Sequence, residues 1–197
     1  MSIFDSLFRR KISLEDQIQT LADCGIRAND GFGSEYFLST FGRDAYEKDP
    51  FVALLCALGG ESEHEPHAPV SSNVWHLDTE CIEDHGSYVR IAQRIATLAG
   101  DALPLKDITD YVDLEEGKAT LSFVLAGQEV RWEPKVNDDW IDPEILTRFV
   151  SLLAGQKTTR LFTYLDLKGQ DCIIGFSTSE QFSALRKSTS LRFEWLK

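Results

Sequence analysis

Positive charge is missing from a long stretch in the first half of the sequence. No lysine or arginine occurs between Asp49 and Arg90, and the formal net charge of the chain is −12. Contacts to phosphate need clustered lysine and arginine, so we expect neither nucleic acid nor an anionic membrane surface as a partner. An acidic surface favours a basic partner, whose approach it steers, although solubility alone also explains an acidic composition.

Further absences bear on where the protein works. No apolar run approaches the roughly 18 residues that a membrane span requires. The start, MSIFDSLFRRK, lacks the apolar stretch of a secretory signal, and Phe4, Leu7 and Phe8 have the spacing of one helical face that docks on the body. The cysteines form no C-x-x-C pair, as is typical of reduced, buried thiols, so we expect a cytoplasmic protein. They are Cys24, Cys56, Cys81 and Cys172.

Motifs that carry catalysis are missing as well. The sequence contains no H-E-x-x-H pair, no G-x-S-x-G elbow and no EF-hand loop for calcium. The run GFGS, from Gly31 to Ser34, is too short for a phosphate-binding loop. We therefore expect a non-enzymatic protein with no catalytic residue, no cofactor and no bound metal.

What the sequence does have is enough apolar material for a sizeable core. Its 197 residues are 43% hydrophobic and 11% aromatic, which favours a single domain over residues 1–197. The polar, proline-containing stretch ESEHEPHAPVSS, residues 61–72, indicates an exposed loop. It suggests a subdivision into a helical N-terminal part, residues 1–60, and an α+β body, residues 73–197.

Capping residues and apolar spacing predict the helices. An N-cap residue followed by proline, or a Ser/Thr with an acidic residue three positions later, marks a helix start, and glycine marks an end. Gly25, the pair Gly59-Gly60 and Gly100 are the predicted ends of the first three helices. The predicted starts are Ser13 with Asp16, Asp49-Pro50, Ser87, Asp142-Pro143, and Ser177 with Glu180.

Alternating apolar residues predict the strands. One is Val74 to Asp78, and a hairpin follows from Lys118 to Lys135 with its turn at Gly127. A second hairpin joins LFTYLDL to CIIGF, and RFEWL gives a final strand. Short connections favour antiparallel pairing, so we expect the α+β class: a mostly antiparallel sheet with helices packed on one face, preceded by a small helical N-terminal part.

Two acidic clusters, each with a tryptophan, are the candidate binding sites. The first is WHLDTECIEDHG, from Trp75 to Gly86, and the second is NDDWIDPE, from Asn137 to Glu144. An aromatic side chain ringed by carboxylates is a suitable anchor for a basic partner, although Asp142 also has the position of a helix cap. The predicted partner-binding residues are Trp75, Glu80, Glu83, Asp84, Asp138, Asp139 and Trp140.

The residues of the first cluster also fit a different function, the binding of zinc. His76, Asp78, Cys81 and His85 carry the imidazole, carboxylate and thiolate groups that bind zinc. A metal-assisted hydrolase, with a zinc-held water beside Glu80 or Glu83, is therefore an alternative function. The same acidic region contains the other two histidines, His64 and His67, with Pro66 between them, and these fit exposed loop residues.

The segments WHLDTECIEDHG, NDDWIDPE and GQDCIIG, taken together, resemble small acidic cytosolic bacterial proteins, some of which are immunity proteins of polymorphic-toxin systems. The resemblance is one of size, acidity and α+β pattern, from about residue 71 onward. It implies a protein that binds a cognate toxin domain, a basic one if the contact is electrostatic, and blocks its active site or substrate surface. A regulatory or scaffold domain is a further alternative, and the oligomeric state stays open.

Overall fold

The computed structural model describes residues 11–62 and 68–197 of the chain. The predicted docking of Phe4, Leu7 and Phe8 lies outside these residues, and so do His64 and His67. Within the described part of the chain, no helix has the length and apolar character needed to cross a membrane.

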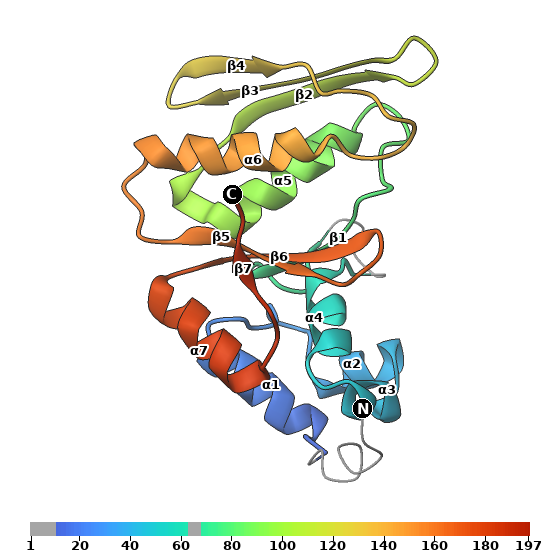
Figure 1. The fold of residues 1–197 in the computed structure, drawn as a ribbon, viewed down its shortest axis with the longest axis vertical. Coiled ribbons are helices and arrows are strands. Elements are labelled where there is room, and N and C mark those ends of the chain that lie inside the picture. The colour runs from blue at the N-terminus through green and yellow to red at the C-terminus, as the bar shows by residue number, and fades with distance from the viewer. Residues whose placement is uncertain (1–10, 63–67) are drawn as a thin grey trace.

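Helices and strands alternate irregularly along the chain (Figure 1). The helices are α1 (Leu14–Asp23), α2 (Ser34–Thr40), α3 (Arg43–Lys48), α4 (Val52–Gly59), α5 (Ser87–Ala99), α6 (Pro143–Leu152) and α7 (Ser179–Thr189), with the short 3-10 turns η2 (Gly100–Ala102) and η3 (Leu153–Gly155). The strands are β1 (Val74–Asp78), β2 (Lys106–Asp113), β3 (Lys118–Leu125), β4 (Gln128–Trp132), β5 (Leu161–Asp166), β6 (Asp171–Ser177) and β7 (Glu194–Trp195).

The strands form two antiparallel sheets, one with the order β1-β6-β5-β7 and one with the order β2-β3-β4. Figure 1 shows the layers: α1 to α4 and α7 lie on one side of the four-stranded sheet, α5 and α6 lie on the other, and the three-stranded sheet covers α5 and α6. The predicted α+β class is confirmed. The expected packing of helices on one face only is found in the three-stranded sheet, whereas the four-stranded sheet has helices on both faces.

Two hydrophobic cores result from this layering. On β1, Trp75 and Leu77 belong to the core that contains α5 and α6, whereas Val74 belongs to the core that contains α1 and α4. On β6, Ile174 faces the first of these cores and Ile173 the second. Alternate residues of a strand point to opposite faces, so both faces of the four-stranded sheet are apolar and buried.

The predicted strand order from Lys118 onward is confirmed, as β3, β4, α6, β5, β6, α7 and β7. The β3–β4 turn has positive φ at both Ala126 (52°) and Gly127 (79°), which suits the twist of a tight hairpin. Strand β2 was not predicted. It is rich in aspartate, its pairing with β3 shifts between Lys106 and Thr109, and Val112 is its one buried residue, so it lacks regular alternation.

Helix caps were predicted with mixed success. Ser13 accepts a hydrogen bond from Asp16 N at 3.1 Å, and Asp142 caps α6 with Pro143 as its first residue, as expected. The predicted box of Ser177 and Glu180 is wrong by one residue. Ser177 is still part of strand β6, and the capping box consists of Thr178 and Gln181.

The start of α4 is also different from the prediction at Asp49-Pro50. Asp49 ends α3, and Phe51 has a φ of 75°, so the helix begins at Val52. The buried Gln17 of α1 explains this geometry, because its side-chain oxygen accepts from Phe51 N at 2.7 Å and its Nε2 donates to Tyr46 O at 2.9 Å. One glutamine thus fixes the entry into α4, and a positive φ at Phe51 prevents an earlier helix start.

Substitution of Gly59, at the end of α4, tests the close contact between α4 and β1. A Cβ at Gly59 would lie 2.2 Å from His76 N, whereas a Cβ at the adjacent Gly60 has its nearest neighbour at 3.5 Å. We expect Gly59→Ala to lower the free energy of unfolding by about 1–3 kcal/mol, because strand and helix must separate. Gly60→Ala is the matched control and should leave it unchanged or raise it by up to about 1 kcal/mol. Urea denaturation measures both, and equal effects would contradict the contact.

Candidate functional site

The two acidic clusters, which are far apart in the sequence, meet in the structure. Ile82 N donates to Asp139 O at 2.8 Å, and Ile141 N donates to Thr79 O, also at 2.8 Å. Glu80 and Trp140 are partners in an isolated antiparallel bridge. The loop after β1 and the loop before α6 therefore run side by side as a short two-stranded ribbon.

This ribbon separates apolar from charged side chains. Ile82 and Ile141 are 2% and 6% exposed and pack into the first core, whereas Glu80 and Glu83 are exposed. Trp140 is 38% exposed, one of few large hydrophobic side chains on the surface. A tight turn with Asp138 at a φ of 55° places Trp140 beside Glu80. An exposed tryptophan beside acidic residues of two distant loops is thus a property of the folded chain.

Asp110 connects β2 to the start of α5, the helix that follows the first loop of the ribbon. Its carboxylate accepts hydrogen bonds from the backbone N–H groups of Gly86, Tyr88 and Val89, at 2.7, 2.9 and 3.1 Å. A carboxylate satisfies the free N–H groups of a first helical turn and interacts favourably with its dipole. Ser87 was predicted to cap this helix, but Gly86 is the N-cap, and the Ser87 hydroxyl accepts from Glu83 N at 3.2 Å.

His85 and Tyr111 extend the charged region toward β2. The ring of His85 lies edge-on to that of Tyr111, with centroids 5.0 Å apart, and its Nδ1 is 2.6 Å from Asp84 Oδ1. The hydrogen bond to Asp84 raises the pKa of His85, and the charges of Asp84, Asp110 and Asp113 raise it further. Tyr111 itself is 41% exposed and donates to Asp113 at 3.2 Å.

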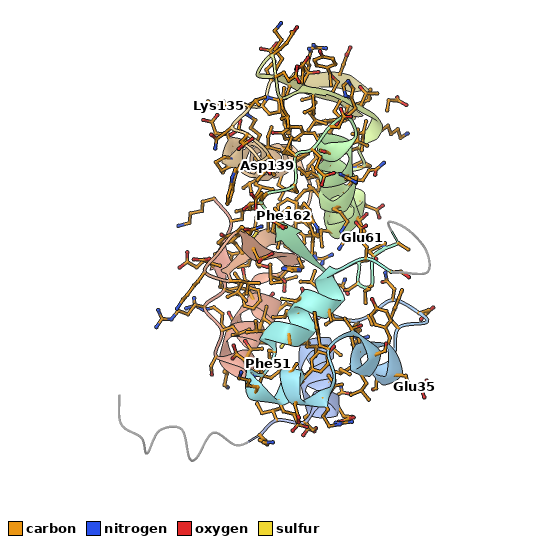
Figure 2. The ribbon with its side chains drawn as sticks, turned by 90° about the vertical axis from the view of Figure 1, so that its right-hand side faces the viewer. Glu35, Phe51, Glu61, Lys135, Asp139 and Phe162 are labelled. Atoms are coloured by element: carbon orange, nitrogen blue, oxygen red, sulfur yellow. The ribbon has the colours of Figure 1, made fainter. Side chains whose placement is uncertain are left out.

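We call the exposed acidic and aromatic side chains of the two loops and of β2 the acidic surface. Among the residues that the structure describes, no lysine or arginine forms an ion pair with any of its carboxylates. Figure 2 looks onto this side of the molecule, with Asp139 labelled. Lys135, also labelled there, pairs with Glu144 instead. The acidic surface consists of Glu80, Glu83, Asp84, Tyr111, Asp113, Asp138, Asp139 and Trp140.

Most of the predicted partner-binding residues lie on this surface, but Trp75 does not. It is 8% exposed and packs in the first core, because β1 belongs to a sheet that is covered on both faces. Tyr111 and Asp113 were missed, since β2 was not recognised as a strand. Tyr111 between Asp110 and Asp113 in KDITDYVD, an aromatic residue among carboxylates, was the signal that could have found them.

The two histidines considered above as zinc ligands each pair with a different carboxylate. His76 pairs with Asp171 at 3.1 Å, and His85 pairs with Asp84. Burial raises the pKa of the Cys81 thiol to about 11, so it is protonated at neutral pH. Within residues 11–62 and 68–197, no group of three histidine, cysteine or acidic side chains could hold a metal ion. The zinc-held water of the alternative mechanism therefore has no set of donors among these residues.

A scan against models of protein families found no match, and searches of curated proteins and of solved structures also found none.

Removal of the Asp110 carboxylate tests how the surface is held together. We expect Asp110→Ala to lower the free energy of unfolding by about 2 kcal/mol, because three backbone N–H groups lose their acceptor. Asp101→Ala is the control, since that exposed aspartate makes no side-chain hydrogen bond among the described residues and should change stability by less than about 0.5 kcal/mol. Urea denaturation compares the two, and a neutral Asp110→Ala would contradict the capping role.

The titration of His85 tests the electrostatics of the surface. We expect its pKa to lie above the usual histidine value and to fall in Asp84→Asn, because the neutral amide no longer favours the imidazolium. The pKa is raised in the folded state, so this contribution to stability is present at low pH and is lost as the pH rises through the folded-state pKa. NMR of the imidazole protons measures the shift, and identical titration curves in both proteins would contradict it.

Proposed function

We propose that this protein is a non-enzymatic binding protein of the immunity type, which binds a basic bacterial toxin domain through the acidic surface and blocks it. The observation that carries the proposal is the meeting of the two acidic clusters around Trp140. Two loops supply carboxylates to one exposed region, and no lysine or arginine among the described residues forms an ion pair with them.

The composition of the acidic surface suits a protein interface. Hot spots are rich in tryptophan and tyrosine, and Trp140 and Tyr111 are both well exposed here. The carboxylates around them, which form no ion pair with a described lysine or arginine, would attract a cationic partner over a distance and raise the association rate. For a toxin that acts on nucleic acid, such a surface would compete with the substrate for the same basic groups.

The backbone of the acidic surface is well supported, which favours binding without rearrangement. The ribbon contains two backbone hydrogen bonds of 2.8 Å, and Asp110 fixes the adjoining start of α5. Preorganised surfaces lose less conformational entropy on binding than flexible loops do. The aromatic and acidic groups are therefore presented in one arrangement before the partner arrives.

The test is capture of the partner from the native host, with charge-matched baits. The first bait variant carries Glu80→Gln, Glu83→Gln and Asp138→Asn, whose side chains make no hydrogen bond among the described residues. The control bait loses the same charge at Asp30→Asn, Glu35→Gln and Asp44→Asn, in the N-terminal helical part, where Figure 2 labels Glu35 far from Asp139. Only the first variant should lose the captured protein.

Two measurements are then made on the captured domain. Its association with the wild-type protein should slow at high salt, where the Debye length falls from about 10 Å at 0.1 M to about 3 Å at 1 M. Expression of the domain alone should arrest growth of a heterologous bacterium, and co-expression of this protein should restore it. Capture of a housekeeping protein that does not arrest growth would contradict the immunity function and favour the scaffold alternative.

The contribution of the aromatic anchor is measured on the same complex. We expect Trp140→Ala to weaken binding by roughly 30-fold, which corresponds to about 2 kcal/mol. Phe41→Ala is the control, because Phe41 is 47% exposed and lies in the N-terminal helical part. Equal affinities of the Trp140→Ala protein and the wild type would remove Trp140 from the interface.

A further inference from the structure

The two sheets have four edge strands, β1, β7, β2 and β4, and the first three are engaged, short or irregular. On β1, Val74 O accepts a hydrogen bond from Nη2 of Arg94 at 3.2 Å, and the same atom donates to Gly59 O at 3.1 Å. Arg94 is 5% exposed, and burial lowers its pKa to about 10, so its side chain is a buried cation. Strand β7 has only two residues, and the register of β2 shifts between Lys106 and Thr109.

Strand β4 is the regular and open edge. Its register with β3 continues without a shift from Gln128 to Trp132. It pairs with β3 alone, and no strand among the described residues lies along its other side. Figure 1 shows β4 at the top of the molecule, in the outermost layer. An edge strand of this kind presents a row of backbone N–H and C=O groups with which another strand can pair.

The hairpin geometry identifies the backbone groups that point away from β3. The turn at Ala126-Gly127 has two residues, so the residues that flank it form a hydrogen-bonded pair. Hydrogen-bonded and non-hydrogen-bonded pairs alternate along antiparallel strands, so Glu129 and Arg131 direct their N–H and C=O groups to the open side. In the described part of the chain, no backbone hydrogen bond outside the sheets involves either residue.

The side chains of Glu129 and Arg131 carry opposite charges on one face of the sheet. They alternate with Val130 and Trp132, which pack against the first core, so both point to the solvent face. Both residues are exposed, and neither forms an ion pair among the described residues. If β4 meets a copy of itself in antiparallel orientation, with a twofold axis at Val130, Glu129 of each copy lies opposite Arg131 of the other.

We propose that β4 is a dimerisation edge, at which a second copy of this chain pairs antiparallel with the first about a twofold axis at Val130. The two three-stranded sheets then form one continuous sheet. Glu129 of each copy and Arg131 of the other exchange both backbone hydrogen bonds, because their N–H and C=O groups point to the open side. Their side chains form a cross-strand ion pair. A twofold interface requires a self-complementary surface of this kind.

The two charges select this register over its neighbours. An axis at Glu129 would place two glutamates opposite each other, and an axis at Arg131 would place two arginines opposite each other. Like charges in directly opposite positions destabilise a strand pair. With the axis at Val130, the two half-buried Val130 side chains meet on the inner face, in the type of pair whose side chains are closest. The ion pairs and this apolar contact therefore favour the same register.

The contact is small, which determines how the dimer behaves. One strand pair of this length buries less than the roughly 1,200 Å² of a stable interface, so we expect the dimer to dissociate on dilution. The net charge of −12 on each copy opposes association. At physiological salt the Debye length is about 8 Å, so this long-range repulsion is screened while contacts within the strand pair remain. Strand β4 contributes no residue to the acidic surface, so the inference does not depend on the proposed function.

Sedimentation velocity over a concentration series gives the first test. The wild-type protein should shift from monomer to dimer as its concentration rises from micromolar to millimolar. Glu129→Arg places like charges opposite each other in both pairs and should weaken self-association by roughly 30-fold, and Arg131→Glu should have the same effect. The matched controls are Glu35→Arg and Arg192→Glu, at exposed positions outside β4, and should leave self-association unchanged.

A mixture of the two β4 variants separates the pairing from any loss of folding. Glu129→Arg gives one chain two positive side chains at these positions, and Arg131→Glu gives the other chain two negative ones. Neither variant alone should dimerise, whereas an equimolar mixture should form a heterodimer, because every cross-strand pair then joins opposite charges. The double variant with both changes should regain self-association. Circular dichroism and a urea midpoint establish that each variant is folded.

Amide hydrogen exchange tests the backbone pairing directly. The N–H groups of Glu129 and Arg131 should exchange more slowly as the protein concentration rises, because they gain acceptors in the second copy. The N–H group of Val130 is the internal control, since it points to β3 and keeps its partner in monomer and dimer. In the Glu129→Arg protein, this dependence on concentration should disappear.

Three results would overturn the proposal. The first is a monomer at every concentration, which would mean that Glu129 and Arg131 protect the edge from pairing. The second is equal weakening of self-association by Glu129→Arg and Glu35→Arg, which would assign the dimer to another surface. The third is slow exchange at Glu129 and Arg131 only in the presence of the captured toxin domain, which would assign the edge to a strand of that partner.

Discussion

The four-stranded sheet, buried on both faces, is the constraint on which most other features depend. The two faces of this sheet pack against different cores, so Trp75 and Val74, neighbours on β1, enter different cores. The same constraint leaves no space for a side chain at two glycines. A Cβ at Gly175 of β6 would lie 2.7 Å from Thr163 Oγ1, and one at Gly59 would meet the backbone of β1. At Gly59 the space is filled by the backbone of β1, and at Gly175 it is filled by the side chain of the cross-strand partner Thr163.

The acidic surface is made at the edge of this arrangement, where chain segments leave the layers. The loop after β1 leaves the four-stranded sheet, the loop before α6 comes from the three-stranded sheet, and β2 contributes Asp110 and Tyr111. Each segment alone is an ordinary polar connection. Together they give a surface with backbone hydrogen bonds, a helix cap and buried isoleucines beneath it. Carboxylates near one another repel, so this support is what keeps them together.

Local patterns in the sequence were enough to find the elements with regular spacing. The apolar periodicity of α5, the hairpin turn at Gly127 and the pair Asp142-Pro143 each carry their own physical signal, and each prediction was confirmed.

The start of α4 could not be predicted locally, since it depends on Gln17, which is distant in sequence. Strand β2 was missed because only its pairing with β3 makes an aspartate-rich segment a strand. All acidic residues of the surface except Asp113 were found by composition, but the meeting of the two clusters required two backbone hydrogen bonds between distant loops. Trp75 was misplaced because composition does not reveal that β1 lies in a sheet covered on both faces.

Arg94 also determines how the two cores depend on each other. Its backbone belongs to α5 in the first core, and its side chain reaches the last residue of α4, a helix of the second core, and the first residue of β1. Opening of either core would break these hydrogen bonds and leave a guanidinium in an apolar environment with fewer partners. The free energies of opening of the two cores, which already share the four-stranded sheet, are thereby coupled more closely, which favours unfolding of the layers together rather than in succession. A single buried charge thus links two cores that pack on opposite faces of one sheet.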